Sequence, residues 1–496
     1  DHRDLHRLIR RQRQMCIRDS VLSDKCEISK CSTECIEVCP QNKKDITAIK
    51  IEQNKARIIH KNCIECLLCI QYCPLKAIEI QKTKEKEVKN KRRRKNKEKS
   101  KYSLFEIDEK IFQPMSEKRT IFARVMWDDT FEGYQKGIFE GAKNKISLNL
   151  DGYSEIEHAA ISGAWAVDGI IGMFEREQLA KMSEEPKNVG DSRGVEKKKD
   201  LLNPEQSAKT KRTLENNPSE LTSWVKKVAM FYGADLVGIT PIDLKWIYTE
   251  DRQGNPLNLP EGLTNVIVFA VEMDIDAINT APKYPSGIAT GLGYSKMAFI
   301  RTLLTFFIRR MGYKAIPAGN NIALSVPLAV EAGLGGYGRH GLLITKKFGP
   351  RVRIAKVLTD MPLIPDKPDY KFVKAVERFC KTCKTCAKKC PSNSIPFDKE
   401  PSFDIQSKVS NNPGIKKWYV NVETCYMFWT ENGCDCSRCI SDCEYNHVYT
   451  LPHKIVNWIV MNLPFLNPIW PLIGKLLGYG GNKSAKKFWK KIKVSP

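Results

Sequence analysis

The sequence predicts an α+β protein whose mixed helix-and-strand core lies between two cysteine-rich segments. Apolar residues recur at helical intervals in some stretches, such as 156–174 and 295–311, and form a continuous strand-like run at 266–271. In addition, 17 of the 18 cysteines fall into four tight groups. A chain of 496 residues is long enough to hold two to four domains of this kind.

The cysteine spacing indicates iron–sulfur clusters. Most spacings are C-x2-C or C-x3-C, which suit a metal better than a loop-closing disulfide. The carboxy-terminal runs supply eight thiolates for two 4Fe-4S clusters: Cys380, Cys383, Cys386 and Cys390, then Cys425, Cys436, Cys439 and Cys443. The amino-terminal runs supply eight more: Cys26, Cys31, Cys35 and Cys39, then Cys63, Cys66, Cys69 and Cys73. We therefore expect four 4Fe-4S clusters in total.

Residues 21–81 are expected to form a two-cluster ferredoxin domain. In bacterial ferredoxins the fourth cysteine of each run ligates the other cluster, so Cys73 would join Cys31, Cys35 and Cys26, and Cys39 would join the second run. The first run departs from the usual spacing and looks most like the variant ferredoxin domain of ribosome-recycling ABC ATPases. Structural zinc is the alternative, but zinc gains nothing from two interleaved runs.

The positive charge is concentrated outside the core. The net charge is +24, and segments 1–20, 82–101 and 482–496 together carry +18 of it. Such runs are typical of solvated linkers and tails, with peripheral contact to an acidic membrane as the alternative. We expect no nucleic-acid partner. We also expect no transmembrane span, because prolines interrupt the most apolar stretch, 455–479.

Composition also suggests the domain boundaries. Residues 1–20 contain RQRQMCIRDS, which resembles a translated sequencing-adapter artefact, so we expect an artefact or disordered segment and a missing natural start. We expect a cytoplasmic protein. The remaining segments are a basic linker at 82–101, an amino-terminal region at 102–217 with a polar insertion at 183–217, a core at 218–375, a two-cluster domain at 376–450 and a helical tail at 451–496.

A glycine-rich motif lies in the core. We expect helices at 156–174 (buried), 221–231 and 295–311, and strands at 234–239 and 266–271. Gly333, Gly335 and Gly338 match the dinucleotide-binding pattern, but that pattern requires a strand before it and a helix after it. Here a helical pattern precedes and a strand pattern follows. We interpret the motif as a turn that lets the backbone approach a large cofactor.

Residues 105–496 resemble the reductive dehalogenases, cobalamin and iron–sulfur enzymes that remove halogen from organic compounds. The resemblance implies a nitroreductase-like core with cobalamin buried against the nearer cluster. The sequence contains no D-x-H-x-x-G motif, so base-off cobalamin without a protein ligand is implied. The motifs come in the family's order: FQP at 112–114, TIFAR at 120–124, GADLVG at 233–238, GLGYS at 291–295, FIRRMGYKAIP at 307–317, EAGLG at 331–335, FGPRVR at 348–353, PLIPDKP at 362–368, the two cysteine runs, and LGYG at 477–480.

Site residues follow from this resemblance. Tyr294 matches the family's proton-donating tyrosine, Asn320 its active-site asparagine and Arg353 the arginine that supports the tyrosine. Reductive cleavage leaves a carbon that must be protonated, and a phenol donates more readily beside a guanidinium that stabilises its anion. Asn320 would orient the substrate or solvate the halide. Trp429 would wall the substrate and cofactor cavity, or else pack on a cluster.

Three positions leave choices open. Cys434 is an extra cysteine beside Cys436, so ligation in the last run is ambiguous. Glu444 follows Cys443 where the family usually has proline. His340 could be a cobalt ligand, but we expect it to be a surface histidine or one that supports the site without binding cobalt.

The expected function is reductive dehalogenation of a small organohalide, with electrons from a reduced ferredoxin or flavodoxin entering at the amino-terminal domain. One alternative is an epoxyqueuosine reductase-like cobalamin enzyme that acts on tRNA. Another is a non-catalytic iron–sulfur electron carrier.

Overall fold

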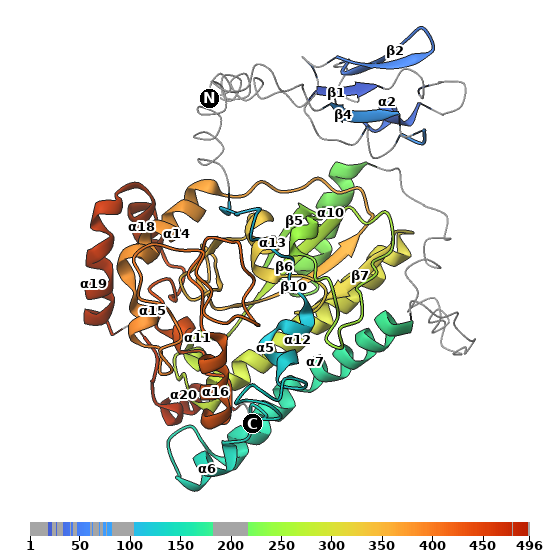
Figure 1. The fold of residues 1–496 in the computed structure, drawn as a ribbon. Helices are drawn as coiled ribbons and strands as arrows, with labels where there is room; N and C mark the ends of the chain where they lie inside the picture. The colour runs from blue at the N-terminus through green and yellow to red at the C-terminus, as the bar shows by residue number, and fades with distance from the viewer. Residues whose placement is uncertain are drawn as a thin grey trace. The chain divides into compact units, whose positions relative to one another are not determined.

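The structure, a computed structural model, describes residues 18–21, 26, 33–39, 41–42, 47–59, 62, 69, 73–75, 77–81, 104–181, 217–478 and 480–494 (Figure 1). The chain divides into two compact units, residues 1–101 and 102–496, and each is considered by itself. The expected basic linker lies outside the described residues, as does the polar insertion except for Asn217. Cys31, Cys63 and Cys66 also lie outside them.

The first unit contains two small antiparallel pairings. Strand β1 (Arg18–Val21) pairs with β4 (Ile78–Gln81), and β2 (Ile49–Glu52) pairs with β3 (Lys55–Ile58); α2 spans Glu34–Glu37. Four described cysteines, Cys26, Cys35, Cys39 and Cys69, are buried in one core with Ala48, Ile49, Ala56, Ile58, Ala77 and Ile78. Residues 18–20 were excluded from the expected fold. In the structure their backbone pairs in register with β4.

The second unit is built on a four-stranded antiparallel sheet of order β5-β6-β10-β7. The strands are β5 (Leu236–Pro241), β6 (Asn265–Glu272), β7 (Ala315–Ala318) and β10 (Val352–Thr359). Seven of the eight residues of β6 are buried, as its continuous apolar run predicts for a central strand. The strands expected at 234–239 and 266–271 are therefore confirmed, with small shifts of their ends.

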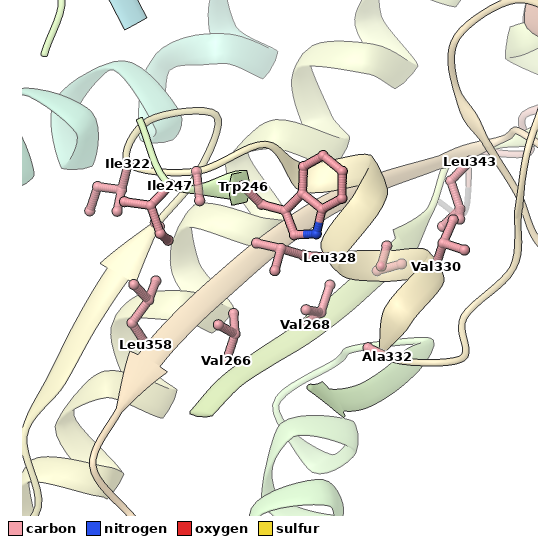
Figure 2. Packing of buried hydrophobic residues seen from close by; sticks show 14 of the residues in the cluster. Trp246, Ile247, Val266, Val268, Ile322, Leu328, Val330, Ala332, Leu343 and Leu358 are labelled. Carbon is pink, nitrogen blue, oxygen red and sulfur yellow. The ribbon is translucent and has the colours of Figure 1, made fainter. Parts of the chain in front are cut away.

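Helices cover both faces of the sheet. On one face, α10 (Pro218–Phe231) and α12 (Tyr284–Arg310) pack on alternate strand residues such as Ile267 and Phe269. On the other face, α13 (Ser325–Glu331) and the Trp246 indole pack on the intervening residues Val266 and Val268 (Figure 2). The mixed α+β core predicted from the sequence is confirmed.

Helix α7 (Glu155–Lys181) lies along α12 (Figure 1). The sequence predicted this helix correctly. It also predicted that the apolar residues of the helix are buried, and for the face that carries Ile156 and Ile170 this prediction was wrong. Ile156 is 82% exposed and Ile170 is 58% exposed. The opposite face packs on α12 instead, because Asp168 and Glu175 pair there with Arg301.

The carboxy-terminal cysteines lie on and around four short helices. These are α14 (Tyr370–Cys383), α15 (Thr385–Lys388), α16 (Val422–Asn432) and α17 (Arg438–Ser441). The tail is helical, as expected: α18 (Leu451–Asn462), η6 (Pro464–Ile469), α19 (Trp470–Leu476) and α20 (Ala485–Lys491). Smaller elements are η4 (Glu117–Arg119), α5 (Ile121–Arg124), α6 (Ala142–Ser147), η5 (Leu244–Trp246), α11 (Ile275–Ile278), β8 (Gly336–Tyr337) and β9 (Leu343–Ile344). Of the helices in the described part of the chain, none has the length and apolarity needed to cross a bilayer.

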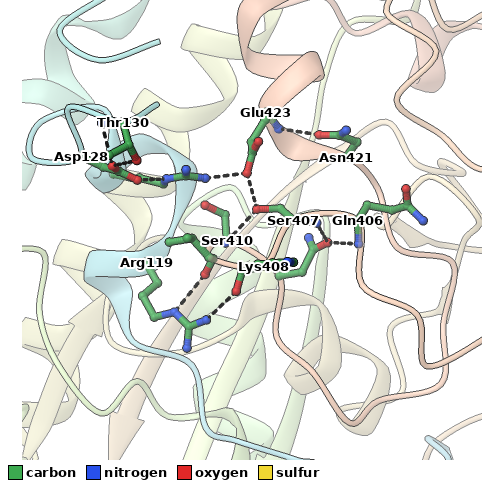
Figure 3. Close-up of polar contacts among 12 residues, drawn as sticks. Arg119, Asp128, Thr130, Gln406, Ser407, Lys408, Ser410, Asn421 and Glu423 are labelled. Carbon is green, nitrogen blue, oxygen red and sulfur yellow. Dashed lines mark hydrogen bonds and ion pairs between the residues drawn. The ribbon is translucent and has the colours of Figure 1, made fainter. Parts of the chain in front are cut away.

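A polar network joins the amino-terminal part of this unit to α16 (Figure 3). Arg124 contacts Asp128 and Glu423, each at 2.5 Å, and the Ser407 hydroxyl donates to the same Glu423 carboxylate at 2.6 Å. The Asn421 side chain caps α16 by accepting from the Glu423 amide at 3.1 Å. Because α16 carries Cys425, this network helps to place one of the predicted cluster ligands.

Candidate active site

The three residues expected at the site come together from three elements. Tyr294 lies on α12, Asn320 follows β7, and Arg353 lies on β10. The Asn320 amide donates to the Tyr294 hydroxyl oxygen at 2.9 Å, and the Arg353 guanidinium lies over the Tyr294 ring, 5.0 Å from its centroid. Arg353 also donates to the Thr290 hydroxyl at 3.0 Å. Residues far apart in the chain thus surround one half-buried phenol.

A glycine allows α12 and β10 to approach one another here. A Cβ atom on Gly293 would lie 3.0 Å from the Arg353 Cγ. That is closer than most side chains tolerate, so a larger residue would push the guanidinium away from Tyr294. This explains one glycine of the GLGYS motif in physical terms.

Trp165 is a site residue that the sequence analysis missed. Its ring stacks on the Tyr294 ring with the centroids 4.6 Å apart and the planes tilted by 25°. A Cβ atom on Gly291 would meet the Trp165 indole at 2.5 Å, so this glycine makes room for the stack. The Ser295 hydroxyl donates to the Ala164 carbonyl at 2.6 Å and fixes α7 against α12 beside it. A tryptophan among small residues on a helix was the available signal.

Eight carboxy-terminal thiols gather in two adjacent sets. Burial raises the pKa of Cys443, and the neighbouring thiols of Cys386, Cys380 and Cys383 raise it further. Burial also raises the pKa of Cys436, whose neighbouring thiols are Cys439, Cys425 and Cys390. We call Cys390, Cys425, Cys436 and Cys439 the proximal set, and Cys380, Cys383, Cys386 and Cys443 the second set.

The membership of the two sets is crossed. Cys443 of the second run packs in one cluster with Cys380 and Cys383 of the first. Cys390 of the first run packs in another cluster with Cys439 of the second and with Cys386, which resembles the ferredoxin arrangement. Cys439 also contributes to the raised pKa of Cys386, so the sets are neighbours. Four thiols per set supply the number and type of ligand that a 4Fe-4S cluster needs. Within the described ranges, no group of three or more His, Cys, Asp or Glu residues could hold a single metal ion.

The proximal set lies beside the Tyr294 site. Burial raises the pKa of Asp435, next to Cys436, while the charge of Arg353 lowers it. The Ser437 hydroxyl donates to the Asp435 carboxylate at 3.0 Å and lies 3.4 Å from the Thr290 hydroxyl, which Arg353 also contacts. Burial raises the pKa of Cys439 to about 12, and Arg353 opposes this rise. Arg353 therefore links the phenol to the proximal set.

Cys434 packs in a cluster of its own, although Cys436 of the proximal set is near enough to contribute to its raised pKa. Its thiol is fully buried and packs with Tyr153, Tyr284 and Ile161, and it accepts from the Asn432 amide at 3.2 Å. Glu444 accepts from the Thr385 hydroxyl at 3.0 Å, and that hydroxyl lies 3.3 Å from the Cys383 sulfur. Glu444, which stands where the resembling family usually has proline, thus contacts the second set through Thr385.

The glycine-rich turn packs against the protein itself. A Cβ atom on Gly335 would lie 2.2 Å from the Ile344 carbonyl oxygen, and one on Gly338 would lie 2.7 Å from the His340 ring. Gly333 has a φ of +79°, which favours glycine. The expected order, helix α13 before and strand β9 after, is confirmed. Contact of this turn with a cofactor stays a prediction.

Trp429 and His340 take different places. Trp429 packs on Phe122 with ring centroids 5.7 Å apart, and its role in a cavity stays a prediction. His340 Nδ1 accepts from the Leu342 amide at 3.2 Å, and burial lowers the pKa of His340 to about 4. Among the described residues, His340 Nε2 and Arg353 Nε are buried polar atoms without a hydrogen-bond partner. Each of these two atoms is open to a partner outside the chain, such as water.

Known proteins are similar to this chain in sequence or in fold. A tetrachloroethene reductive dehalogenase of Desulfitobacterium hafniense is 38% identical over 303 residues, which cover 53% of this chain and 54% of the relative. Over this region the chain is similar to the reductive dehalogenases. It thus spans about half the length of the curated dehalogenase it matches. No protein-family model matches the chain.

A similar fold is also found in a solved structure. A reductive dehalogenase, described with a mechanism for B12-dependent dehalogenation, superposes with a TM-score of 0.57 at 20% identity, over 76% of this chain and 48% of that one. An epoxyqueuosine reductase of Aliivibrio fischeri is 36% identical over only 88 residues, 18% of this chain and 22% of that relative. The longer match therefore lies with the dehalogenases.

Proposed function

We propose that this chain is a reductive dehalogenase that replaces a halogen of a small organohalide by hydrogen, with Tyr294 as the proton donor. The observation that carries the proposal is the contact of Tyr294 with Asn320 and Arg353 beside the proximal cysteine set. The net reaction consumes two electrons and one proton and releases a halide ion. The phenol of Tyr294 would supply the proton, and the neighbouring cysteine sets, when they hold clusters, would supply the electrons.

The hydrogen bond direction suits proton donation. Because the Asn320 amide donates to the Tyr294 oxygen, the phenol does not use its own proton in this hydrogen bond, and the proton stays available for donation to a substrate. When that proton leaves, the amide donor and the Arg353 charge both stabilise the phenolate. Thr290 holds the guanidinium in place through a 3.0 Å hydrogen bond.

Cofactors complete the proposal. Cobalamin, when bound in its base-off form, supplies the strongly reducing centre for carbon–halogen cleavage. The turn at Gly333, Gly335 and Gly338 and the unpartnered Arg353 Nε and His340 Nε2 are the residues we expect to hold it. The proximal and second sets would each hold one 4Fe-4S cluster. The amino-terminal unit would hold two more and accept electrons from a reduced ferredoxin or flavodoxin.

The test is anaerobic reconstitution with iron, sulfide and cobalamin. The product is examined for corrinoid absorbance and for halide release from tetrachloroethene and brominated phenols, with reduced viologen as electron source. We expect corrinoid retention and halide release with at least one substrate class. Protein that holds iron but no corrinoid would contradict the proposal and favour an electron carrier. Tight binding of a tRNA stem-loop without halide release would favour the tRNA-directed alternative.

A further inference from the structure

The loop that carries Asn320 has a strained backbone. Residues 319–324 connect β7 to α13, and Ile322 in this loop has a φ of +69°. A β-branched residue rarely adopts this left-handed conformation. The Ala323 amide donates to the Asn321 carbonyl at 2.8 Å, which closes a tight turn around Ile322. The Ile322 side chain is buried in the core beside Ile247 (Figure 2).

One side chain from the sheet contacts this loop at several points. Lys356 lies on β10 opposite Ala318 of β7, and its side chain is fully buried. Its ammonium donates to the Gly319 carbonyl, to the Ala323 carbonyl at 3.0 Å and to the Ser325 hydroxyl at 2.7 Å. Three oxygens thus satisfy three ammonium protons, and together they span the loop from one end to the other.

We propose that Lys356 is a positioning residue, which holds the strained 319–325 segment so that Asn320 meets Tyr294. This inference rests on the proposed function for its catalytic consequence. Its structural content stands on the contacts of Lys356 alone. Lys356 points to the opposite face of the sheet from Arg353, since the two residues are three apart in one strand. It therefore acts through the loop and not on the phenol.

The groups around Lys356 explain why a cation suits this buried position. Burial lowers the pKa of Lys356 to about 7, and the charge of Arg301 adds to this effect while Glu117 opposes it. A Cβ atom on Gly319 would lie 3.2 Å from Arg301 Nη1, so Arg301 borders the loop as well. An apolar residue would avoid the cost of burying a charge, but it would leave two backbone carbonyls without a donor.

The experiment compares Lys356→Met with a matched variant, Lys417→Met. Burial also lowers the pKa of Lys417, to about 8, but Lys417 lies over the Tyr419 ring at 4.6 Å, away from the loop. Amide hydrogen exchange is measured on the full chain without substrate. We expect faster exchange at Ile322 and Ala323 in Lys356→Met and unchanged exchange there in Lys417→Met. Equal exchange in both variants would overturn the proposal.

A second readout uses the reconstituted enzyme. Lys356→Met should lower kcat for halide release about tenfold to a hundredfold, a range typical of a small misplacement of a catalytic group. Combined with Asn320→Ala, it should cause little further loss, because both changes remove the same contact. Fully additive losses would overturn the proposal. Ser325→Ala, which removes one of three acceptors and leaves the ammonium, should cause a smaller loss in the same direction.

The two proposals fail differently. If the wild-type protein releases no halide, the proposed function fails, whereas amide exchange still shows whether Lys356 holds the loop. If wild-type activity is present and loop exchange is unaffected by Lys356→Met, the positioning role fails and the dehalogenase assignment stands.

Discussion

Asn320 donates its side-chain amide to the phenolic oxygen of Tyr294 at 2.9 Å, across the gap between a loop and helix α12. This donor would stabilise the phenolate that proton transfer leaves behind. We predict that Asn320→Ala lowers kcat for halide release by about a hundredfold, the scale of losing one oxyanion donor. The measurement is steady-state halide release by the reconstituted enzyme.

Asn320→Asp is the control for this prediction. It keeps the size of the side chain but replaces the amide donor with an acceptor, so it should be at least as damaging as Asn320→Ala. An Asn320→Asp enzyme with wild-type kcat would show that the amide donor has no part in the reaction.

The crossed cysteine sets predict how iron is lost. In the double variant Cys383→Ser and Cys443→Ser, both changes fall in the second set, so about four irons per chain should be lost. In Cys383→Ser and Cys390→Ser, the changes fall in different sets, so about eight should be lost. Iron and sulfide are determined on the purified, reconstituted chain.

Cys434→Ser is the matched control for this pattern. Cys434 is fully buried among Tyr153, Tyr284 and Ile161, so its replacement should leave the iron content unchanged. A loss of about four irons in Cys434→Ser would place this cysteine among the ligands and contradict the assignment of the sets.

The stack of Trp165 on Tyr294 predicts a loss of both stability and activity. Trp165→Leu should lower the free energy of unfolding by about 1 kcal/mol through the lost ring contact. It should also lower kcat, because the phenol gains freedom to move. Trp224→Leu is the control, since Trp224 is 50% exposed on α10. Halide release that is the same in the two variants would contradict a role for the stack.

The burial of His340 predicts that the free energy of unfolding falls as the pH is lowered. Burial lowers its pKa to about 4, whereas an unfolded histidine binds a proton near pH 6.5. The unfolded state therefore binds more protons between these values, and the folded state loses stability as pH falls from 6.5 towards 4. His340→Gln cannot be protonated, so its free energy of unfolding should fall less than that of wild type in this window. A constant difference between the two proteins from pH 7 to 4 would contradict this.

Part of the fold could be predicted because the responsible signals are local. Strand β6 is a continuous apolar run between turn residues, and α10 begins at Pro218, directly after its cap Asn217, and ends before Gly233. Helix α7 shows the limit of this approach. Its apolar positions looked like a buried face, but the ion pairs of Asp168 and Glu175 with Arg301 turn the other face inward.

The site was only partly predictable, because several of its contacts join residues that are far apart in the sequence. Tyr294 and Arg353 could be proposed because they stand in motifs that resemble those of a known family, and Asn320 because the same resemblance assigns its position. Trp165 could not, since its partner Tyr294 is far along the chain. Lys356 looks like an exposed residue of an alternating strand, and only the loop after β7 shows why it is buried. Likewise, spacing left Cys434 ambiguous, and its packing separates it from the cysteine sets.

The central claim is that Tyr294 supplies the proton that replaces the halogen. The most direct measurement compares halide release by wild type and Tyr294→Phe, both reconstituted anaerobically and matched for corrinoid and iron content. We predict that Tyr294→Phe loses activity by about a hundredfold to ten-thousandfold, the usual contribution of a general acid, while it keeps both cofactors. Full activity in Tyr294→Phe would contradict the claim.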